Sequence, residues 1–192
     1  MKKIILTCII LISFSISINA QTRKKEEFKM KTDQSILNWK GSSLFNFGEH
    51  YGTVLFKEGH LKITNGRISG GKFIIDMNTI VNTDGEYSEG LVMHLKDKDF
   101  FDVFNYLTSM LEITQVSYID DTTVEISADL TIKGITKPIE FSGKINSNKG
   151  ELSTKFIIDR TRWGVVFASK SITSVKDHIL SDAIEFEAKL YF

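Results

Sequence analysis

The stretch TVEISADLTIKGITKPIEFSGKIN, residues 123–146, decides the fold of this chain. Its first half places an apolar residue at every second position: Val124, Ile126, Ala128, Leu130 and Ile132. A period of two puts these side chains on one face of a β-strand and the intervening polar ones on the other. The second half alternates in the same way from Ile139, and Lys133-Gly134 between the halves predicts a tight hairpin turn. The stretch therefore predicts antiparallel sheet with one apolar face.

The same alternation continues on both sides of this hairpin. LSTKFIID (152–159) and AIEFEAKLYF (183–192) repeat it, and turn residues such as Asn65-Gly66 and Gly70-Gly71 separate the earlier runs. About eight such strands suffice to close a small barrel, which removes exposed sheet edges. The sequence thus predicts an all-β domain, an eight-stranded antiparallel barrel, with a two-sheet sandwich as the structural alternative.

One segment, HLKDKDFFDVFNY (94–106), departs from the strand pattern. Phe100, Phe101 and Phe104 are spaced to share one helical face. We therefore expect a short helix or helical turn that caps one end of the barrel, with its phenylalanines directed inward and its aspartates outward. The polar run before it, TDGEYSEGL (83–91), is expected to be a loop.

The N-terminus is typical of an exported protein. Residues 1–20 combine a basic start, an apolar run and a small residue, Ala20, which predicts a signal peptide. A charged leader, residues 21–34, follows, and the barrel domain is expected over 35–192. Cleavage removes Cys8, the only cysteine, and leaves 22 basic and 24 acidic residues, which gives no basic surface for nucleic acid. We expect a periplasmic or secreted protein with no membrane span after cleavage.

No motif of catalysis or metal binding stands out. There is no G-x-S-x-G elbow, and the histidines lack the spacing of a zinc site, so we expect neither an enzyme nor a metal protein. Asp159 and Arg160 adjoin a strand end and are interpreted as a structural ion pair. His50 and His94 lie at predicted strand ends beside apolar runs, where they are candidates for the mouth of a barrel.

Five segments resemble the YceI-like family in order and spacing: HYGTVLFKEG (50–59), GGKFIIDMNTI (70–80), HLKDKDFFDV (94–103), ADLTIKGITKPIEF (128–141) and IDRTRWGV (158–165). The resemblance covers about Trp39 to Phe192. It implies a lipocalin-like barrel that binds a lipid or polyisoprenoid, without catalytic residues. The implied ligand is a polyprenoid or an isoprenoid quinone, and no other cofactor is expected. Head group, chain length and oligomeric state stay open.

Strand parity and the cap predict which residues face such a ligand: Phe73, Ile75, Phe100, Phe101, Phe104, Ile126, Leu130, Phe141, Phe156, Ile158 and Phe186. A two-residue turn at Lys133-Gly134 would set Leu130 opposite Lys137 and direct Lys137 inward as a head-group contact. A bulge at Lys137-Pro138 would instead turn it to solvent, the outcome that the cost of burying a lysine favours. The alternative to a ligand-binding barrel is a filled one that acts through a protein partner.

Overall fold

The computed structural model of the chain describes residues 23–43, 48–85, 88–170 and 179–192. The predicted signal peptide, residues 1–20, lies outside this part. The described residues form one helix, one 3-10 helix and nine strands: β1 (Lys25–Lys29), β2 (Ile36–Ser42), β3 (Glu49–Thr64), β4 (Arg67–Asn82), α1 (Ser88–Lys96), β5 (Thr108–Tyr118), β6 (Thr123–Ile132), β7 (Ile135–Asn146), β8 (Glu151–Asp159), η1 (Arg160–Trp163) and β9 (Ala183–Tyr191).

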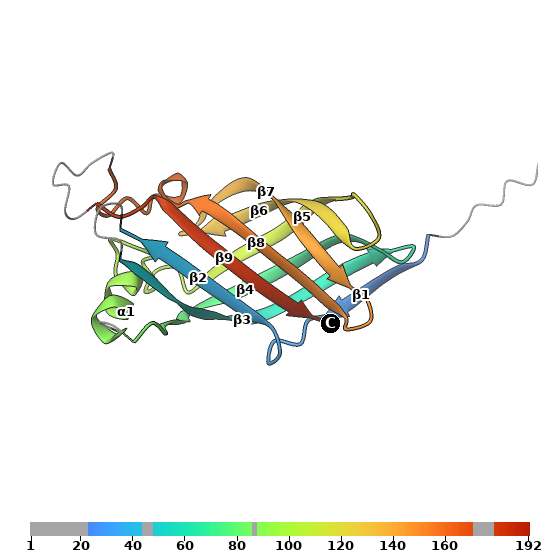
Figure 1. Cartoon of the computed structure of the whole chain (residues 1–192), viewed down its shortest axis with the longest axis horizontal. Coiled ribbons are helices and arrows are strands. Elements are labelled where there is room, and N and C mark those ends of the chain that lie inside the picture. Colours follow the sequence, from blue (N-terminus) through green and yellow to red (C-terminus); the bar gives the residue numbers. More distant parts are fainter. Residues whose placement is uncertain (1–22, 44–47, 86–87, 171–178) are drawn as a thin grey trace, which may run out of the picture.

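Eight of these strands close into an antiparallel barrel (Figure 1). The order of neighbours is β3-β2-β9-β8-β7-β6-β5-β4, and β4 returns to pair with β3. The predicted eight-stranded barrel is therefore confirmed, and the sandwich alternative is wrong. The ends of the barrel differ, because α1 lies at one end and β1 and the C-terminus at the other. We call these the cap end and the β1 end.

The ninth strand, β1, lies within the segment predicted to be a leader outside the fold. It pairs with residues 60–64 of β3, beyond the part of β3 that pairs with β2. Met30, directly after β1, is only 3% exposed, and its amide donates a hydrogen bond to the carbonyl of Gly59. The predicted boundary at residue 35 is thus too late, because the charged residues of the segment conceal a strand.

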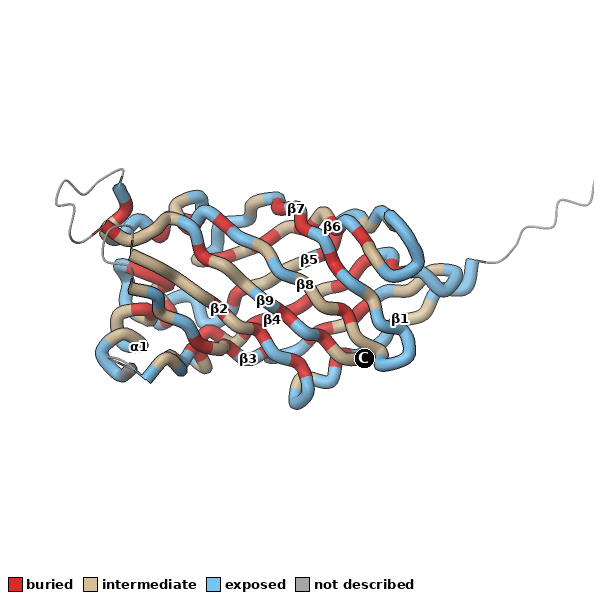
Figure 2. The backbone as a smooth tube through the Cα atoms, viewed as in Figure 1, coloured by how far each residue is buried: buried red, intermediate tan, exposed pale blue. Residues whose placement is uncertain are grey.

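The hairpin that decided the prediction has the expected register. Ile132 pairs with Ile135 across a two-residue turn, and Lys133 and Gly134 both have positive φ, 48° and 71°. Such φ values match the turn twist to the twist of the strands. Burial then alternates along β6 and β7 (Figure 2), so their apolar residues face the interior of the barrel.

The helix at the cap end lies earlier in the chain than predicted. α1 covers Ser88–Lys96, much of which was expected to be a loop, whereas the phenylalanines follow it in turns. Asp102 has a φ of 50°, which reverses the chain and places Val103 in the interior. Phe104, predicted to face inward, is 91% exposed as a result.

Candidate functional site

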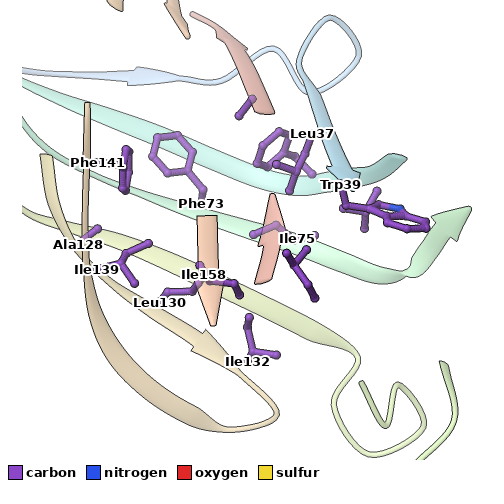
Figure 3. Packing of buried hydrophobic residues seen from close by; sticks show 14 of the residues in the cluster. Leu37, Trp39, Phe73, Ile75, Ala128, Leu130, Ile132, Ile139, Phe141 and Ile158 are labelled. Carbon is purple, nitrogen blue, oxygen red and sulfur yellow. The ribbon is translucent and has the colours of Figure 1, made fainter. Parts of the chain in front are cut away.

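The barrel is hollow and encloses a cavity of about 340 Å³. This volume lies within the usual range of small-molecule sites. All eight barrel strands and the cap contribute to its wall, which is almost entirely apolar. In Figure 3, Phe73, Phe141 and Leu130 extend from separate strands into the same interior. Because the cavity remains between such side chains, the interior is not a filled core.

The cavity is elongated and extends from the cap to Leu152 and Leu190, near the β1 end. Along β4 its wall runs from Phe73 to Ile80, which corresponds to about 20 Å at the usual rise of a strand. Met30, Leu61, Ile68 and Val124 are buried at the β1 end and do not line the cavity. The β1 end thus holds a packed layer beyond the cavity.

Nine of the eleven residues predicted to contact a ligand line this cavity: Phe73, Ile75, Phe100, Phe101, Ile126, Leu130, Phe141, Phe156 and Phe186. Two do not. Ile158 is buried in the core but is not part of the cavity wall, and Phe104 points into solvent. Parity correctly assigned the face of Ile158, but it could not show where the cavity ends along β8.

Several wall residues were missed by the sequence analysis. Leu37 and Trp39 come from β2, where the run ILNW shows the same period of two and could have identified them. Leu95 and Phe167 line the cap end of the cavity. Phe167 follows η1 in an irregular segment, so no periodicity indicates its direction.

Two groups of aromatic rings shape the cavity. At the cap, the Phe100 ring lies 5.3 Å from that of Phe101 and 6.4 Å from that of Phe167, measured between centroids. Along the wall, Phe156 stacks on Phe141 at 4.8 Å and is 5.6 Å from Phe186. Rigid rings of this kind give a ligand large apolar contact at little cost in side-chain entropy.

Polar residues of the wall gather at the cap end. They include Ser42, Ser109 and Ser181 at strand ends, together with both predicted mouth histidines. His50 lines the cavity, and its Nδ1 lies 2.7 Å from Oδ2 of Asp84. His94 lines the cavity from α1 and packs its ring 4.3 Å from the ring of Phe167. The cavity therefore has an apolar body and one polar end.

Arg160 is the charged residue of this polar end, and it is 1% exposed. Its Nη2 lies 3.4 Å from Oδ1 of Asp182, so the predicted ion pair with Asp159 is wrong in its partner. Asp159 instead caps η1 by accepting hydrogen bonds from the amide and hydroxyl of Thr161. Burial lowers the pKa of Arg160, and Asp182 and then Asp159 oppose that shift.

Lys137 does not line the cavity. It pairs with Leu130 and shares its parity with Ile139 and Phe141, so the register expected for an inward side chain is present. No bulge interrupts the pairing between β6 and β7. Lys137 is nevertheless only half-buried, because it lies close to the turn. The predicted bulge at Lys137-Pro138 is therefore wrong. The predicted head-group contact through Lys137 is wrong as well, because its side chain is not part of the cavity wall.

Among the described residues, no group of three His, Cys, Asp or Glu side chains is placed to hold a metal ion. In that part of the chain, no helix is both long enough and apolar enough to span a membrane.

Comparison with known proteins identifies the family. A family model described as a YceI-like domain matches residues 28–192. A UPF0312 protein of Pseudomonas putida strain F1 is 26% identical over 124 residues, 62% of each chain, and one of Ectopseudomonas mendocina is 28% identical over 110 residues, 57% of this chain and 56% of that one. The chain thus matches less than two thirds of these relatives' length. The crystal structure of Burkholderia cenocepacia BcnA has the same fold, with a TM-score of 0.65 at 15% identity, over 84% of this chain and 98% of BcnA.

Proposed function

The chain belongs to the YceI-like family, whose barrels bind apolar ligands, and we propose that it binds an isoprenoid-type lipid inside its barrel. The observation that carries this proposal is the apolar cavity of about 340 Å³. A dry cavity of this size is costly to a fold, because its wall loses packing contacts. A bound apolar chain would restore those contacts.

Affinity in such a site would come from the chain of the ligand. Each buried methylene contributes about 0.8 kcal/mol, and one net hydrogen bond contributes about 1 kcal/mol. Several methylenes along the stacked rings of Phe141, Phe156 and Phe186 therefore outweigh any single polar contact. The elongated shape of the cavity suits one extended chain better than a compact ligand.

The proposal includes export and a carrier role without catalysis. The pattern of residues 1–20 supports secretion to the periplasm or beyond, and the polyprenoid or isoprenoid quinone is proposed as cargo and not as a cofactor. A carrier needs a site that shields an apolar chain from water. The polar end of the cavity, near His50 and His94, would orient the head of the ligand.

The test is native mass spectrometry of the protein purified without detergent from the cells that produce it, followed by organic extraction. We expect a discrete additional mass that releases an isoprenoid lipid. If the protein carries no lipid and takes up neither added quinone nor polyprenol, the proposal is wrong. A protein-interaction role for the outer surface would then be the reading to pursue.

A further inference from the structure

Arg160 makes fewer hydrogen bonds than its buried guanidinium can donate. Its Nε donates to the carbonyl of Ser181 at 3.0 Å and its Nη1 to that of Val165 at 2.7 Å. Nη2 is buried and makes no hydrogen bond to any described residue, although it faces Asp182 across 3.4 Å. A buried charged donor without a full set of acceptors costs free energy. Because Arg160 lines the cavity, a ligand can supply the acceptor.

A second buried polar atom without a partner lies nearby, and it donates a hydrogen bond when the imidazole carries its proton on Nε2. Nε2 of His94 is buried and has no hydrogen-bond partner within the described part of the chain. Its ring lies 5.8 Å from the centre of the Phe100 ring, and the guanidinium carbon of Arg160 lies 5.5 Å from that same centre. The two groups are therefore no more than about 11 Å apart. Both border the polar end of one cavity and lie against the same ring.

The charge of this end is balanced. Among the described wall residues, Arg160 carries the one permanent positive charge, and Asp182 lies beside it. His50 is likewise paired with a carboxylate, that of Asp84. A phosphate or diphosphate brought into this end would face a guanidinium whose charge Asp182 already offsets, so no excess positive charge would compensate for its desolvation. An uncharged oxygen acceptor would satisfy the free donor without that cost.

We propose that Arg160 and His94 bind an uncharged hydrogen-bond-accepting head group of the lipid, and that Asp182 excludes anionic heads by neutralising Arg160. This inference rests on the proposed function and adds a selectivity to it. A carbonyl or hydroxyl oxygen is the ligand chemistry that Nη2 of Arg160 selects. The apolar wall binds the chain regardless of its head, so the polar end decides between lipids of equal length.

The test compares farnesylacetone, an uncharged ketone, with farnesyl phosphate on the whole protein by isothermal titration. We expect the ketone to bind about tenfold more tightly or better, because the phosphate would lose its hydration without a net positive charge to compensate for that loss. Asp182→Asn is nearly isosteric and keeps the backbone bond from the Arg160 amide to the residue-182 carbonyl. This variant should lower the ratio of the ketone's association constant to that of the phosphate about tenfold. Asp121→Asn, a matched change of a 97% exposed carboxylate, should leave the ratio unchanged.

A second variant tests the donors separately. His94→Leu keeps an apolar wall, and we expect it to weaken the ketone several-fold while binding of farnesene, a hydrocarbon without a head group, is retained. A wild-type protein that binds the phosphate as tightly as the ketone, or an Asp182→Asn variant with an unchanged ratio, would overturn the inference and leave the lipid proposal standing. Failure to bind the ketone, the phosphate and the hydrocarbon alike would overturn both.

Discussion

Phe100 and Phe104 provide a matched pair of substitutions at the cap. They are the same residue type, four positions apart, but Phe100 is 6% exposed and lines the cavity, whereas Phe104 is 91% exposed. The two were predicted from sequence to act together. The structure predicts opposite results for Phe100→Ala and Phe104→Ala.

The magnitude follows from the contacts of the Phe100 ring. It packs against Phe101, His94 and Phe167, and the guanidinium of Arg160 lies over its face. Truncating a buried phenylalanine costs about 3–5 kcal/mol, including about 0.5–1.5 kcal/mol for each aromatic pair. Because the adjoining cavity already lacks contacts, we expect about 3 kcal/mol for Phe100→Ala. Phe104→Ala should change the free energy of unfolding by less than about 0.5 kcal/mol.

Urea unfolding followed by tryptophan fluorescence measures both variants, because Trp163 is fully buried and reports the folded state. Equal slopes against urea would show that the same surface is exposed on unfolding. Lipid retention, measured by native mass spectrometry, should fall for Phe100→Ala and stay at the wild-type level for Phe104→Ala. Equal stability of the two variants would refute the placement of the Phe100 ring at the centre of the cap.

Three further substitutions test the wall and the turns. Ile75→Trp should reduce lipid uptake about tenfold or more, because the indole occupies ligand space, and should change the free energy of unfolding by less than about 2 kcal/mol. Unaltered uptake in native mass spectrometry would place the ligand elsewhere. Asp120→Ala should destabilise the protein near neutral pH in urea titrations. Hydrogen bonds from Thr122 and then Thr123 lower the pKa of Asp120 from 3.8, so its contribution is present above that value and is lost as the pH falls through the lowered pKa. A destabilisation that does not shrink as the pH falls below 3.8 would contradict this origin. Gly134→Ala should lower the free energy of unfolding by about 1 kcal/mol, because φ is 71° and a Cβ would lie 3.1 Å from the Tyr106 ring; an unchanged thermal midpoint would count against it.

The parts of the fold that sequence predicts are those in which local pattern and long-range packing agree. The β6–β7 hairpin has a period of two, a turn that tolerates positive φ, and a buried face, and all three specify one register. The cap lacks such agreement. The helical spacing of the phenylalanines predicted an inward position for both Phe100 and Phe104. Phe100 is buried, but the positive φ of Asp102 directs Val103 inward in place of Phe104. Single-residue reversals of this kind leave no periodic trace.

The polar end of the cavity was the least predictable part for a related reason. Arg160 pairs with Asp182, 22 positions later and across the β8–β9 strand ends, while the adjacent Asp159 turns back to cap η1. Adjacency in sequence therefore suggested the wrong partner. Strand parity predicts apolar walls because every second residue repeats the signal, whereas head-group contacts come from single residues at strand ends and turns.

The packed layer beyond the cavity at the β1 end bears on how a lipid-binding barrel can stay folded when empty. The β1 end, with Met30, Leu61 and Val124 nearly fully buried, holds a core that does not depend on a ligand. The cap end lacks part of its contacts until the cavity is occupied. A ligand that binds only the folded state then adds stability that grows with the logarithm of its concentration above Kd. Such an increase should concentrate at the cap, so hydrogen exchange of the amides of 94–103 should slow on lipid binding, while that of β1 should stay unchanged.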